Sequence, residues 1–84
     1  MTPEALRERL CSLWPLPWRI DPGATDVPVV AAEVGTLCVA VGLTTPLTVV
    51  GVLDDEDFYE EQTDDLAAAL AELDRALRAR VALN

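Results

Sequence analysis

The sequence predicts an α+β domain with an N-terminal helix, an antiparallel sheet of three to four strands and a long C-terminal helix, in the order α-β-β-β-(β)-α. Two observations predict this order. Leucines recur at helical spacing near both ends of the chain, at positions 6, 10 and 13 and at positions 66, 70, 73 and 77. Between them lie three apolar, valine-rich runs, at 27–34, 36–43 and 47–53. All 84 residues are assigned to one small domain, 1–84.

Residues 2–13 are predicted to form the first helix. Thr2 is a good capping residue, Pro3 suits the first helical position, and Glu4 interacts favourably with the positive end of the helix dipole. Pro15 ends the helix, because the residue before a proline is disfavoured in the α region.

Two tryptophans flank the prolines of the next segment, Trp14-Pro15-Leu16-Pro17-Trp18. Their rings either form an aromatic platform for a ligand or cover the core as a lid, and the lid is the commoner arrangement. Residues 16–20 are expected to lead into a short edge strand, because the prolines exclude a central one. Asp21-Pro22-Gly23 predicts a turn, with a loop that runs to about Asp26.

The three apolar runs predict an antiparallel sheet. The first two are separated by little more than Gly35, which indicates a hairpin, and Thr44-Thr45-Pro46 predicts the turn before the third. If both helices pack on one side of the sheet, the other side is an apolar face that water solvates poorly. This predicts a homodimer or a partner surface, unless the helices cover opposite faces. The predicted face consists of Val30, Ala32, Cys38, Ala40, Val50 and Val52.

Residues 54–81 are predicted to form one continuous helix, with a break near Thr63 as the alternative. Its leucines form one stripe, which Tyr59 joins. Acids at the start and arginines at the end complement the helix dipole, and Asp74 with Arg78 forms a favourable i,i+4 pair. Asp57 and Glu60 fit a capping-box-like start. The face opposite the leucines carries a stripe of carboxylates, from Asp57, Glu60, Glu61 and Asp64.

Six basic and fifteen acidic residues give the chain a net charge of −9. This charge repels nucleic acids and anionic membranes, so neither is a predicted partner. A partner recognised by charge should be basic, although acids also keep a small apolar protein dissolved. Every basic residue is an arginine, a bias typical of a GC-rich bacterial genome, such as that of an actinobacterium, or of a phage.

The side chains needed for common catalytic sites are missing from the sequence. It has no histidine and no lysine, so a serine or cysteine nucleophile activated by histidine is impossible. Two cysteines without histidine do not make a usual zinc site, and the acidic run 54–57 lacks the spacing of an EF-hand. No enzymatic activity, cofactor or metal is predicted. No signal peptide and no membrane-spanning run is found, which predicts a cytoplasmic location.

Two functional hypotheses follow. The first is a small acidic, non-enzymatic protein-binding module of the inhibitor, immunity or phage-modulator type. It would bind a basic protein surface through the carboxylate stripe, whose line of charge would mimic a DNA strand. The alternative is a homodimer, like those of secretion chaperones, that binds an apolar segment through its sheet face. Binding through carboxylates should weaken steeply as salt rises, whereas binding through an apolar face should not.

Overall fold

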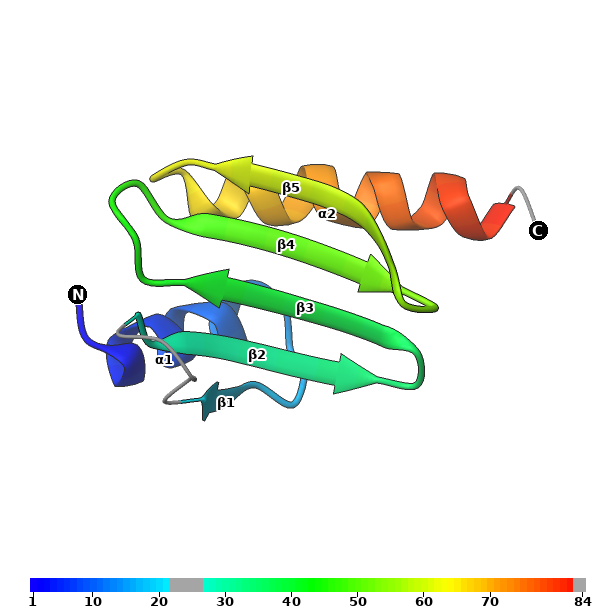
Figure 1. Ribbon diagram of the computed structural model, residues 1–84. Helices are drawn as coiled ribbons and strands as arrows, with labels where there is room; N and C mark the ends of the chain where they lie inside the picture. Colours follow the sequence, from blue (N-terminus) through cyan, green and yellow to red (C-terminus); the bar gives the residue numbers. More distant parts are fainter. Residues whose placement is uncertain (22–26, 83–84) are drawn as a thin grey trace.

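Two helices pack on one face of a five-stranded antiparallel sheet (Figure 1). The structure, a computed structural model, describes residues 1–21 and 27–82. The turn predicted after residue 21 lies outside this part of the chain. In chain order the elements are α1 Pro3–Leu13, β1 Arg19–Asp21, β2 Val29–Val34, β3 Leu37–Gly42, β4 Thr48–Leu53, β5 Glu56–Gln62 and α2 Leu66–Ala82. The predicted α+β class and element order are confirmed, and the sheet gains a fifth strand.

The N-terminal segment follows the prediction closely. Thr2 Oγ1 accepts a hydrogen bond from the backbone N–H of Ala5 at 3.1 Å, which caps α1. Trp18 is buried in the core, and its Nε1 donates to the carbonyl oxygen of Trp14 at 2.7 Å. Trp18 therefore acts as the predicted lid, and β1 directly after it is the predicted short edge strand.

Alternate residues of the central strands enter a single core. Val30, Val41 and Val49 are cross-strand partners, and all three are fully buried. Leucines from both helices join them in one cluster, which includes Leu6 of α1 and Leu73 of α2. Since these buried side chains share one face of the sheet, the opposite face is left without a helix. Figure 1 views the molecule from this open side, with both helices behind the sheet.

The predicted helix over 54–81 is wrong in its first part. Asp54 and Asp55 both have positive φ angles, 52° and 64°, and form a tight turn from β4 into β5. The helix begins at Leu66, where Asp65 Oδ1 accepts a hydrogen bond from the N–H of Ala68 at 3.1 Å. Asp65 therefore caps α2, and the capping box predicted at Asp57 and Glu60 does not exist.

The acidic segment forms strand β5, with a bulge that lets two consecutive aromatic residues pack against the core. Gly51 pairs with Tyr59 and Val52 with Asp57, so Phe58 is the extra residue of the bulge. Phe58 and Tyr59 both pack against the core. Aromatic residues favour strands, and here their burial outweighs the helical spacing that the leucine stripe shares with Tyr59.

The remainder of the predicted C-terminal helix is confirmed. Leu66, Leu70 and Leu73 are buried along one stripe of α2. On the exposed side, Arg78 Nε donates to Asp74 Oδ2 at 3.1 Å, as the i,i+4 spacing predicts.

Candidate functional site

The surface that stands out is the sheet face that the helices leave uncovered, here called the open face. Side chains alternate along each strand, so the neighbours of the buried valines point to this side. Its centre is apolar, and most of these side chains are half-buried in the monomer. The apolar side chains of the open face are Val29, Ala31, Cys38, Ala40, Val50 and Val52.

Charged residues lie on both margins of the open face. On the β5 side Asp57 and Glu60 are exposed, and together they form what we call the acidic margin. On the other side Arg19 of β1 forms an ion pair with Glu33 of β2 at 3.0 Å. An apolar centre inside a charged rim is the usual arrangement of a protein–protein interface.

The structure places four of the six residues predicted for this face, Cys38, Ala40, Val50 and Val52, on the open face. The prediction is wrong for Val30 and Ala32, since both lie on the helix side of the sheet and are essentially fully buried. Glu33 is the signal that could have identified the right residues. It is the one charged residue of β2 and is exposed. Side chains alternate along a strand, so Ala31 and Val29, two and four residues before Glu33, lie on the same side of the sheet.

The predicted carboxylate stripe on a helix does not exist. Asp57 and Glu60 lie on β5 and face the open side, whereas Glu61 faces the helices. Asp64 lies in the loop between β5 and α2. The four acids therefore divide between two faces and a loop, because a strand turns alternate residues to opposite sides.

Tyr59 connects β5 to α2. Its hydroxyl lies 2.7 Å from Glu61 Oε2 and 3.2 Å from Glu72 Oε2. Burial, followed by the hydrogen bonds and charges of these two carboxylates, raises the pKa of the Tyr59 phenol well above its ordinary value. This contact helps to hold the helix against the edge strand and is assigned no catalytic role.

The pKa of Tyr59 makes a pH prediction. Because the folded protein holds the phenol proton more tightly than the unfolded chain, this stabilisation is complete below pH 10 and falls as pH rises above it. Tyr59 is the single tyrosine, so phenolate absorbance reports on it alone. We expect the phenolate band to appear at higher pH in the native protein than in denaturant. Identical titration curves in the two states would contradict the contact.

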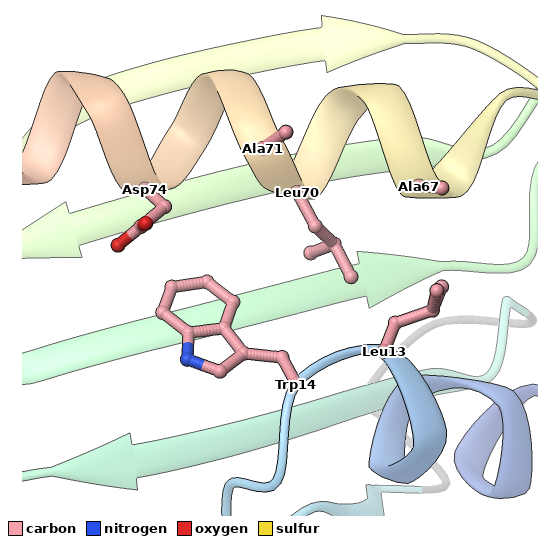
Figure 2. Close-up of a pocket in the computed structure, with 6 residues that line it drawn as sticks. All are labelled: Leu13, Trp14, Ala67, Leu70, Ala71 and Asp74. Atoms are coloured by element: carbon pink, nitrogen blue, oxygen red, sulfur yellow. The ribbon is translucent and has the colours of Figure 1, made fainter.

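A small groove separates the two helices (Figure 2). Leu13 and Trp14, from the end of α1, point toward Leu70 and Asp74 of α2, and the groove holds about 200 Å³. Ligand pockets usually span about 300–1,000 Å³, and the Asp74 carboxylate already accepts a hydrogen bond from Arg78. The ring of Trp14 is half-buried in this groove, so it leaves little room for a ligand to stack on it.

A wider hollow of about 470 Å³ lies where the β2–β3 and β4–β5 turns meet. It is lined by Glu33, Cys38, Asp54 and Asp55, among others, and it continues the open face through Cys38 and Val52. Burial, together with the charge of Glu33, raises the pKa of the Cys38 thiol. The thiol therefore stays protonated at neutral pH and lacks the reactivity of a thiolate.

No protein-family model matches the chain, and no curated protein or solved structure matches it either. In the residues that the structure describes, no three acidic, cysteine or histidine side chains converge on a point where they could hold a metal ion. Neither α1 nor α2, over its described length, has the size and apolar character of a bilayer-spanning segment.

Proposed function

We propose that the protein is a non-enzymatic module that binds another protein surface through the open face and its acidic margin. One observation supports this proposal above the others. A sheet face whose apolar centre spans β2, β3 and β4 is covered by neither helix, and exposed carboxylates lie beside this centre on β5. Apolar faces of antiparallel sheets normally pack against another layer.

The charges of the open face favour a protein as the ligand. The chain carries a net charge of −9, and of the charged residues named on the face only Arg19 is basic. A phosphate backbone or an anionic lipid surface would meet repulsion there. A protein surface with apolar side chains at its centre and arginine or lysine at its rim would match both parts of the open face.

In this proposal the acidic margin binds the basic part of the partner, which the sequence analysis had predicted for a carboxylate stripe on a helix. Asp57 and Glu60 retain that role as carboxylates beside the binding surface. Glu61 and Asp64 leave the proposal, because neither points to the open face. Both partners predicted from the sequence, a basic protein and an apolar segment, would then bind the same surface. The basic protein would contact the acidic margin, and the apolar segment would contact the apolar centre.

Affinity capture with matched variants tests the proposal. We expect Ala40→Arg, at the centre of the open face, to abolish partner capture, because it places an unpaired charge within an apolar contact. Asp57→Asn with Glu60→Gln should weaken capture by about ten-fold if the partner is basic. Raising NaCl from about 50 mM to about 500 mM should then weaken wild-type capture, and it should not do so for a purely apolar segment.

Two control variants carry equal chemical changes away from the open face. Glu4→Gln with Glu8→Gln removes two exposed charges from α1, and Ala79→Arg adds an arginine to an exposed position of α2. Both controls should retain capture. If Ala40→Arg binds partners as strongly as Ala79→Arg does, the open face is not the binding surface.

A further inference from the structure

We infer that the partner of the open face is a second copy of this chain, packed face to face about a two-fold axis parallel to the strands. This inference rests on the proposed function, because it names the partner of the same surface. It comes from the order of charges along one row of residues that crosses the whole sheet.

The row contains one residue from each strand. Arg19 pairs with Ala31, Ala31 with Ala40, Ala40 with Val50, and Val50 with Glu60. A cation therefore stands at one end of the row, a carboxylate stands at the other, and three small apolar side chains lie between them. β3 is the middle strand of the sheet, so Ala40 is the centre of the row.

A two-fold rotation about an axis along β3, midway between two facing sheets, makes this row complementary to itself. The rotation places β3 over β3 and β1 over β5, and it leaves each residue at the same height along the strands. Arg19 of each copy then faces the partner's Glu60, and the apolar centres face each other. A two-fold axis across the strands would instead bring Arg19 over the partner's Arg19 and Glu60 over the partner's Glu60.

The dimensions fit such a dimer. Facing sheets pack about 10 Å apart, which extended arginine and glutamate side chains from the two copies can span together. The usual crossing angle of about 30° shifts the sheet margins by several ångströms, a displacement that the long arginine and glutamate side chains can follow. β1 has three residues and the other four strands have six or seven. The face therefore covers roughly 450 Å², and two copies would bury roughly 900 Å², close to the lower bound of about 1,000 Å² for a specific interface.

The existing ion pair of Arg19 does not oppose this arrangement. Arg19 and Glu33 have side chains 63% and 60% exposed, and exposed pairs of this kind contribute little to stability. The guanidinium can therefore bond a second carboxylate across the interface. The other acids whose strand positions face the interface, Asp21, Glu33 and Asp57, add like charge, as does the net charge of −9 on each copy. Salt screens that repulsion, so added salt should not dissociate the dimer.

Sedimentation equilibrium tests the dimer and its geometry. The wild type should change from a mass near 9.1 kDa to twice that mass as its concentration rises. Arg19→Glu and Glu60→Arg should each weaken dimerisation by ten-fold or more, because each places like charges opposite one another twice. An equimolar mixture of the two variants, and the double variant on one chain, should each restore wild-type affinity. Ala40→Arg should abolish the dimer, with circular dichroism showing that it remains folded.

Each other outcome overturns the inference in a distinct way. A wild type that stays monomeric at millimolar concentration rules out the second copy as the partner. The proposed function would then still be decided by the capture experiment with Ala40→Arg. A dimer that neither Arg19→Glu nor Ala40→Arg weakens uses another surface. A mixture that binds tighter than the wild type indicates a two-fold axis across the strands.

Discussion

Leu73→Ala is expected to lower the free energy of unfolding by about 3 kcal/mol, the usual cost of emptying a leucine site in a well-packed core. Leu73 is completely buried and belongs to the core cluster between α2 and the sheet. A domain of this size is expected to have a total stability of only about 4–13 kcal/mol. The substitution should therefore shift the urea midpoint markedly.

Leu77→Ala provides the matched control, because it removes the same atoms from the next turn of the same stripe. Leu77 is only half-buried, so its truncation should cost about 1 kcal/mol. Helix propensity changes equally in both variants, so their difference measures packing alone. Equal losses for the two variants would mean that the core does not end near Leu73.

The parts of the fold that the sequence predicted correctly are those in which local and tertiary preferences agree. Thr2 and Pro3 begin α1, and the valine-rich runs that became β2, β3 and β4 have no competing structure. Leu66, Leu70 and Leu73 are helical by spacing and are also buried. When local preference and tertiary packing favour the same structure, a single sequence is enough to identify it.

The acidic segment before α2 was mispredicted because its pattern fits two structures. Tyr59 lies at helical spacing from Leu66, Leu70 and Leu73, which extended the apparent helix toward the N-terminus. Asp54 and Asp55 are residues that turns favour, but the pair lacks the glycine of the usual Asn-Gly or Asp-Gly hairpin, so the local signal for this tight turn is weak. The bulge at Phe58 also breaks the alternation by which a strand is normally recognised.

The candidate site was predicted in part for a similar reason. The open face was expected from the absence of polar alternation in the strands, and Ala40 and Val50 lie on it. In β2, however, four apolar residues precede Glu33, so the apolar run alone does not decide which side faces the helices. The acidic margin arises only when β5 pairs with β4, and this pairing is a tertiary contact that a helical reading of the segment excludes.

Gly51→Val should destabilise the protein by about 2 kcal/mol or more, because no side chain fits at this position. A Cβ atom on Gly51 would lie 2.7 Å from Phe58 Cζ and 3.2 Å from Leu73 Cδ1. The Phe58 ring occupies the space because the bulge turns it toward α2. Relief of the clash requires the ring to move, which would loosen both the bulge and the helix packing.

Gly42→Ala separates this steric effect from the general cost of replacing a strand glycine. A Cβ atom there would meet only Thr48 Cβ, at an ordinary contact distance of 3.9 Å. Gly42→Ala should therefore leave the free energy of unfolding unchanged or raise it slightly, because alanine reduces the freedom of the unfolded chain. Gly51→Val combined with Phe58→Ala should recover part of the loss, since it removes the ring that the new side chain meets. If Gly51→Val is as stable as the wild type in urea, Phe58 does not lie over Gly51, and β5 does not have the bulge that places it there.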